Sequence, residues 1–232
     1  YEMLRSLVGS EMCIRDSNIK RGKYIKKADV VWGDSLSGIK TKKKFNLLVT
    51  SPPYGDNQTT VTYGQFSYLP LQWIPVSDID DNIDLDYLRT TQEIDYRSLG
   101  GQIKGNIKDI EEQMFEKSQT LKKFITQFDN AERKKAEKVT RFIYELDCSI
   151  DKMLPKMKDN SFLAWTIGNR NVNKQVVRND LILSELFFSK KIELFTGLER
   201  DILSKRMPGR NNFSNTMSTV SYTHLTLPTI RL

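Results

Sequence analysis

The chain has 232 residues, and 36 Lys and Arg against 29 Asp and Glu give it a formal net charge of +7 at pH 7. This length can bury a substantial core, as one domain or as a domain with an insert. No apolar run in the sequence approaches the ~18 residues of a membrane span, so we expect no membrane association. With only two cysteines, Cys13 and Cys148, a reducing cytoplasmic location is expected.

Both ends of the chain look foreign to the rest. Residues 1–17 (YEMLRSLVGSEMCIRDS) and 220–232 (VSYTHLTLPTIRL) look like translated sequencing-adapter read-through and carry no weight in the predicted fold. The alternative is a genuine N-terminal amphipathic helix and a genuine C-terminal strand. Without these ends the chain also lacks His224 and Cys13, so no histidine is left for acid–base chemistry. We therefore expect no metal site and no intrachain disulfide.

Charge is unevenly distributed along the chain. Residues 76–116 hold 11 acidic and 4 basic side chains, a net charge of −7, so the rest of the chain carries +14. This contrast predicts a mainly helical, acidic to mixed insert over 76–129, between two parts of a basic body at 18–75 and 130–219. The positive charge of residues 18–75 and 130–219 is suited to binding a polyanionic partner.

The first half of the body predicts short strands and one helix. Continuous apolar runs at 28–32 and 45–50 are typical of strands in a parallel sheet that is covered on both faces. A short helix or turn is expected over 36–44. Residues 64–74 predict a helix that is kinked or interrupted at Pro70.

The clearest helix is predicted over 131–154. Its apolar residues recur at helical spacing, Asp129 and Glu132 resemble a capping box, and Pro155 ends the pattern. Arg133 and its neighbouring lysines are interpreted as a solvated first turn.

The last third of the body alternates between strand and helix. A buried strand at 161–167 is closed by residues 168–170, and a helix is predicted over 174–188. A further strand begins at 192–195 and is followed by a loop at 204–212. This alternation indicates an α/β fold with a parallel sheet.

The most informative segment is the strand at 45–50 with the loop Ser51-Pro52-Pro53-Tyr54 directly after it. Neither proline has an N–H, so the strand ends abruptly and nearby carbonyls are left to accept hydrogen bonds from an exocyclic amine. Tyr54 offers a ring on which a base can stack. In an open α/β sheet, ligands bind beyond the carboxyl ends of the strands. We therefore expect residues 33–35, 51–54 and 168–170 to share one crevice, although each could also be an ordinary strand-ending turn.

The strand and its Ser-Pro-Pro-Tyr loop resemble the catalytic motif of class I amino-group DNA methyltransferases, which transfer a methyl group from S-adenosylmethionine to an exocyclic base nitrogen. Serine in the first position is typical of the branch that acts on cytosine N4, whereas adenine-N6 enzymes more often have Asp or Asn. Residues 28–35 (ADVVWGDS), 55–73 and 198–210 resemble further regions of the cytosine branch. The resemblance implies a Rossmann-like methyltransferase sheet, incomplete in this chain.

The resemblance also implies roles for individual residues. Ser51 and the carbonyl of Pro52, in the loop that Pro53 stiffens, would hold the amine of a flipped cytosine while Tyr54 stacks on the ring. Asp34 and Ser35 would lie near the cofactor adenine. Candidate DNA contacts are Tyr63, Asn169, Arg170, Lys205, Arg206 and Arg210. The implied partners are double-stranded DNA and a cognate restriction endonuclease.

The sequence departs from this family in one respect. No Gly-x-Gly occurs between residues 18 and 219, and the acidic residue that would follow such a cofactor loop is absent too. We therefore expect a fragment with an unpaired sheet edge, marginal stability, negligible cofactor affinity and no activity alone. Adenine-N6 methylation, methylation of a protein or RNA amine, and a non-catalytic DNA-binding or specificity module remain alternatives. A cytosine carbon-5 mechanism would need a Pro-Cys nucleophile, whereas Cys148 lies in a predicted helix.

Overall fold

The computed structural model describes residues 21–22, 35–56, 62–75, 85–100, 105–201 and 219–226. The chain divides into two compact units, 1–33 and 34–232, and the fold given below is that of the second. Its strands are β1 Phe45–Thr50, β2 Met157–Gly168, β3 Arg170–Val172, β4 Gln175–Val177, β5 Glu193–Asp201 and β6 Thr219–Thr226. Its helices are α2 Tyr63–Trp73, α3 Thr91–Tyr96, α4 Ile107–Lys117, α5 Gln119–Thr126, α6 Asn130–Met153 and α7 Asn179–Ser189, with short 3-10 turns η2 Leu85–Leu88 and η3 Leu154–Lys156.

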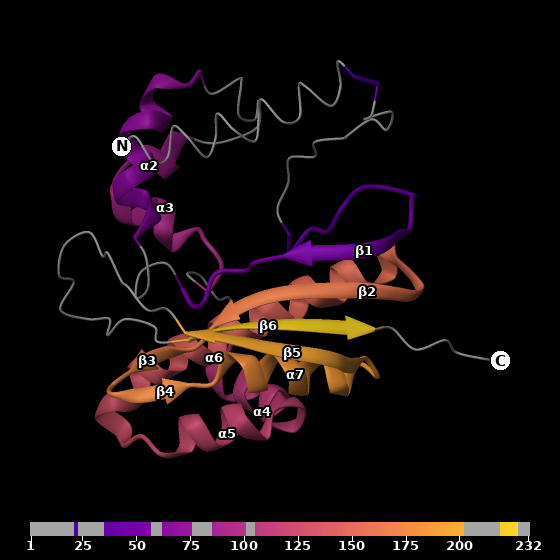
Figure 1. Ribbon diagram of the computed structural model, residues 1–232. Coiled ribbons are helices and arrows are strands. Elements are labelled where there is room, and N and C mark those ends of the chain that lie inside the picture. Colours follow the sequence, from indigo (N-terminus) through magenta and orange to yellow (C-terminus); the bar gives the residue numbers. More distant parts are fainter. Residues whose placement is uncertain are drawn as a thin grey trace. The chain divides into compact units, whose positions relative to one another are not determined.

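Within the described residues, a four-stranded sheet has the order β1-β2-β6-β5 (Figure 1). β1 runs parallel to β2, with Thr50 opposite Trp165, whereas β6 is antiparallel to both of its neighbours. The predicted α/β class is confirmed, but the expected parallel sheet is wrong for β6, which pairs antiparallel with β2 and β5. The carboxyl ends of the parallel strands β1 and β2 meet at one edge. The strand expected at 28–32 lies outside the described residues. Residues 220–226 of the adapter-like end form β6 together with Thr219, and the foreign origin of that end stays a prediction.

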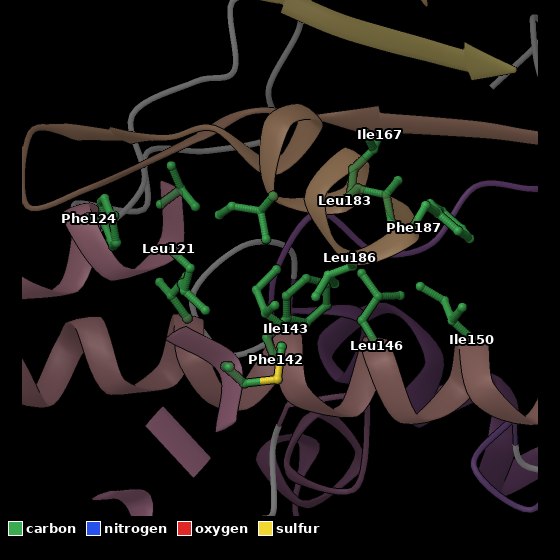
Figure 2. Packing of buried hydrophobic residues seen from close by; sticks show 14 of the residues in the cluster. Leu121, Phe124, Phe142, Ile143, Leu146, Ile150, Ile167, Leu183, Leu186 and Phe187 are labelled. Carbon is green, nitrogen blue, oxygen red and sulfur yellow. The ribbon is translucent and has the colours of Figure 1, made fainter. Parts of the chain in front are cut away.

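One face of the sheet is covered by helices. Leu163, Trp165 and Ile167, at alternate positions of β2, are buried in the core cluster together with residues of α6 and α7. Figure 2 shows side chains of α6 pointing toward those of α7. The rings of Trp165 and Phe187 meet edge to face, with centroids 5.4 Å apart. This packing fixes β2 relative to α7.

Helix α6 confirms the strongest prediction from the sequence. It covers Asn130–Met153, and the backbone N–H of Glu132 donates to Asp129 Oδ1 at 2.9 Å, as the predicted cap requires. Phe142 and Leu146 of its apolar stripe are buried. Pro155 lies in η3, which follows the helix directly.

The predicted helix over 174–188 is wrong at its start. Asn173 and Lys174 have φ of 50° and 64°, and they join β3 to β4 in a hairpin that pairs Val172 with Gln175. A two-residue turn of this left-handed type favours Asn, because its short polar side chain tolerates positive φ. Helix α7 therefore begins only at Asn179. The strand predicted to begin at 192–195 is β5, which continues to Asp201.

The described part of the acidic segment is helical, as predicted, although its limits as an insert remain a prediction. Helices α4 and α5 place Met114 and Leu121 in the same core cluster as α6. Arg133 pairs with Glu111 at 2.6 Å, so this arginine is not simply solvated as expected. No helix in the described ranges has the length and apolar character needed to cross a membrane.

The second face of the sheet is apolar and exposed. Leu47, Val49 and Phe162 alternate with the core-facing residues of β1 and β2, and Val49 is 71% exposed. The rings of Phe162 and Phe195 touch edge to face across this surface, at 6.3 Å. β1 is also the outer strand of the sheet as far as the described residues show. Parallel strands such as β1 and β2 normally have both faces covered.

Candidate active site at the ends of strands β1 and β2

The Ser51–Tyr54 loop leaves the sheet at the carboxyl end of β1. Ser51 and Pro53 are exposed, whereas Pro52 and Tyr54 are half-buried. Tyr54 packs against the core cluster, which fixes one side of its ring. The loop therefore offers an accessible hydroxyl beside an anchored aromatic residue.

Asn179, the first residue of α7, joins this loop to the neighbouring strand. Its side-chain nitrogen donates to the carbonyl oxygen of Tyr54 and to that of Gly168, each at 2.9 Å. The two carbonyls lie 114 residues apart in sequence, so a single buried amide links the ends of β1 and β2. These contacts bring residues 51–54 and 168–170 together, as predicted. A crevice shared with residues 33–35 stays a prediction, since 33 and 34 lie outside the described residues.

An ion pair lies directly behind the loop. Arg170 Nη1 is 3.4 Å from Asp56 Oδ2, and the two residues are only 5% and 1% exposed. Burial lowers the pKa of Arg170, while the charge of Asp56 and its hydrogen bond act in the opposite direction. A Cβ on Gly55 would lie 2.0 Å from Arg170 Nη1, so only glycine permits this close approach. Arg170 was predicted as a DNA contact, and that role stays a prediction.

Asn169, which lies between β2 and β3, contacts the start of α7. Its Oδ1 accepts a hydrogen bond from the backbone N–H of Asp180 at 3.2 Å. Arg178 holds the Asp180 carboxylate through two bonds of 3.0 and 2.8 Å. Burial alone would raise the pKa of Asp180, but the bonds from Arg178, Leu181 and Asn169 outweigh it and lower that pKa. These contacts fix the helix end that carries Asn179, and they leave a DNA-contacting role for Asn169 untested.

The predicted cofactor residues are only partly described. Ser35 Oγ lies 3.4 Å from Ser149 Oγ of α6, whereas Asp34 falls outside the described residues. The basic residues Lys205, Arg206 and Arg210 fall outside them as well. The described residues contain no group of three or more His, Cys, Asp or Glu that could hold a metal ion.

A comparison with curated proteins accords with the loop and its setting. The chain is similar to a type II methyltransferase. It is 36% identical over 181 residues to the type II methyltransferase M.MvaI of Kocuria varians, a match that covers 77% of this chain. The chain spans 38% of the length of that methyltransferase. No protein-family model matches the chain. No solved structure matches it.

The structure also places the remaining residues considered for a methyltransferase site. Tyr63 of α2, which was predicted to contact DNA, is exposed and is therefore not a core residue. Cys148 is half-buried, and burial is the main cause that raises the pKa of its thiol, which disfavours a nucleophilic thiolate. Sequence reasoning missed Asn179 and the pairing of Asp56. The one signal for Asn179 was a helix-capping residue type directly before the apolar run of α7.

Proposed function

We propose that this chain carries the amine-holding loop of an S-adenosylmethionine-dependent DNA methyltransferase that modifies the N4 amine of cytosine. The observation that carries the proposal is the Ser51–Tyr54 loop, which projects from the end of a strand paired in parallel and is tied to the next strand. The similarity to a type II methyltransferase supports DNA methylation in general. The serine at position 51 favours cytosine over adenine.

The loop would act by positioning the target amine. Ser51 Oγ and the Pro52 carbonyl would accept hydrogen bonds from the two amine hydrogens of a cytosine that has left the base stack, and Tyr54 would stack on its ring. Held in this way, the nitrogen directs its lone pair at the methyl donor. Orientation and fixed dipoles supply catalysis of this kind without a histidine or a covalent enzyme intermediate.

S-adenosylmethionine, when bound, supplies a methyl group on a positively charged sulfur. Of the two expected cofactor contacts, Asp34 lies outside the described residues, and the hydroxyl of Ser35 lies 3.4 Å from that of Ser149. The role proposed for this chain is therefore limited to binding and orienting the target amine. We propose that the cofactor site belongs to a part of the enzyme that the chain lacks, so that residues 18–219 neither bind the cofactor nor methylate DNA alone.

The proposed substrate is duplex DNA, which suits the +14 charge of the chain outside residues 76–116. Tyr63 and the basic loop that contains Lys205, Arg206 and Arg210 are proposed to contact it. A cognate restriction endonuclease in the same cytoplasm is the proposed biological partner.

Substitution of Ser51 tests the proposal in the complete protein. We expect Ser51→Ala to lower methylation by roughly 100-fold or more, which is typical of losing one positioned hydrogen-bonding group, while duplex binding stays unchanged. Ser67→Ala is a matched control, because the Ser67 hydroxyl donates to the carbonyl of Tyr63 within α2 at 2.9 Å. Unchanged methylation by Ser51→Ala would reject the proposed role and favour a DNA-binding module.

A further inference from the structure

We propose that Asn179 is a positioning residue that sets the geometry of the Ser51–Tyr54 loop from the start of α7. This inference rests on the proposed function of that loop. Asn179 contributes no group to the reacting atoms. It acts through the backbone of Tyr54, which its side chain holds.

The Ser51–Tyr54 loop needs a hydrogen bond from outside itself to hold its conformation. Pro52 and Pro53 have no N–H, so half of the Ser51–Tyr54 loop cannot anchor itself through its own backbone donors. The carbonyl of Tyr54 is the point at which the loop is fixed from outside, by the Asn179 amide at 2.9 Å. Because a displacement of about 1 Å can cost roughly 100-fold in rate, the stiffness of this contact matters for the proposed chemistry.

The identity of the donor follows from its surroundings. Two carbonyl oxygens face the same side-chain atom of Asn179, so that atom must be the nitrogen, since an oxygen there would repel both. Each amide hydrogen is used once. Asn179 Oδ1, by contrast, is buried and has no partner among the described residues. A buried group left unpaired is costly, so the contribution of this amide comes from the two hydrogen bonds that its nitrogen donates.

The position of Asn179 is itself rigid. The residue is 1% exposed and is the first residue of a helix whose Leu183 and Phe187 are fully packed in the core. The next backbone N–H, that of Asp180, is held by Asn169. The core cluster thus anchors α7, α7 places Asn179, and Asn179 places Tyr54.

Hydrogen–deuterium exchange of the full 232-residue chain tests the tie without any need for activity. Asn179→Leu keeps a similar shape but donates no hydrogen bond. We expect it to speed exchange in a peptide covering residues 50–56 by about tenfold, as loss of one buried hydrogen bond implies, with residues 139–150 of α6 unchanged. The matched control is Ser184→Ala, one turn along the same helix, whose hydroxyl donates to the Asp180 carbonyl at 2.9 Å. It should change neither region.

If Asn179→Leu also loosens α6, Asn179→Ser serves instead. Its hydroxyl donates one hydrogen bond, so the loop should exchange at an intermediate rate while α6 stays protected. Wild-type exchange of residues 50–56 in a folded variant would overturn the proposal. So would equal acceleration by Ser184→Ala.

The catalytic consequence is measured separately in the complete protein. We expect Asn179→Leu to lower kcat at least tenfold while KM for DNA changes less than twofold, because the loop is misplaced but the DNA surface is intact. A variant with normal kcat would overturn the positioning role. If the wild-type protein does not methylate DNA, the proposed function fails, and the exchange experiment still decides whether Asn179 ties the loop.

Discussion

Gly55→Ala is expected to destabilise the protein far more than an exposed Gly→Ala substitution should. The added Cβ would lie 2.0 Å from Nη1 and 2.5 Å from Cζ of Arg170, well inside any permitted contact. Gly55 has no positive φ, so backbone strain contributes nothing and the cost comes from this collision. Gly197→Ala is the matched control, because nothing lies within 4 Å of the Cβ that it would add.

The size of the effect follows from the ion pair that must move. The guanidinium has to shift by about 1 Å or more to reach normal contact distance, and its 3.4 Å approach to Asp56 already lies at the outer limit of a hydrogen bond. Breaking a buried pair costs about 3–5 kcal/mol. Because this contact is long, we expect the lower part of that range or slightly less, about 2–3 kcal/mol.

Urea unfolding followed by circular dichroism measures this difference. With a slope of about 2 kcal/mol per M, Gly55→Ala should lower the unfolding midpoint by about 1 M, while Gly197→Ala stays within about 0.5 kcal/mol of wild type. Adding Gly55→Ala to Arg170→Ala should then cost little, since the colliding group is gone. Equal stability of the two glycine variants, or the same cost with and without the Arg170 side chain, would refute this reasoning.

Two further predictions concern the open sheet face and a buried carboxyl. Val49→Lys should reduce aggregation of the chain, measured by light scattering, and change the free energy of unfolding by less than about 0.5 kcal/mol, because Val49 is exposed on an outer strand. Leu48→Lys, on the core-facing side of the same strand, should instead be strongly destabilising. Equal losses of stability in the two variants would contradict the assignment of the two faces. Burial raises the pKa of Asp95 above its usual 3.8, although hydrogen bonds from the backbone of Gly64 and Tyr63 act in the opposite direction. The contribution of Asp95 to stability is therefore greatest below pH 3.8 and is lost as the pH rises through its folded-state pKa. Asp95→Asn keeps an oxygen for the Gly64 N–H and should flatten the pH dependence of the melting temperature above pH 4, whereas an unchanged profile would contradict the raised pKa.

Local sequence signals predicted the elements that depend on local chemistry. Helix α6 combined an apolar stripe, an Asp129 cap and a terminating proline, and the structure has it within one residue at each end. β1 was predicted correctly because an apolar run ended at two prolines. In both cases the side chains that decide the structure lie within a few residues of it.

The failures involve information that is not local. Val176 and Val177 fit a helical pattern, but the left-handed turn at Asn173 and Lys174 places them in a hairpin. The tie between Asn179 and Tyr54 spans 125 residues, and no spacing rule could reveal it. The burial of Arg170 was missed for the same reason, since its partner Asp56 belongs to a distant loop.

The most direct test of the central claim is the modified base itself. DNA from cells that express the complete protein containing this chain should be digested to nucleosides and analysed by mass spectrometry beside DNA from cells expressing the Ser51→Ala variant. We expect 4-methylcytosine in the wild-type sample, and none above background in the variant. The appearance of 6-methyladenine instead would show that the enzyme acts on adenine, and no methylated amine at all would contradict the proposed activity.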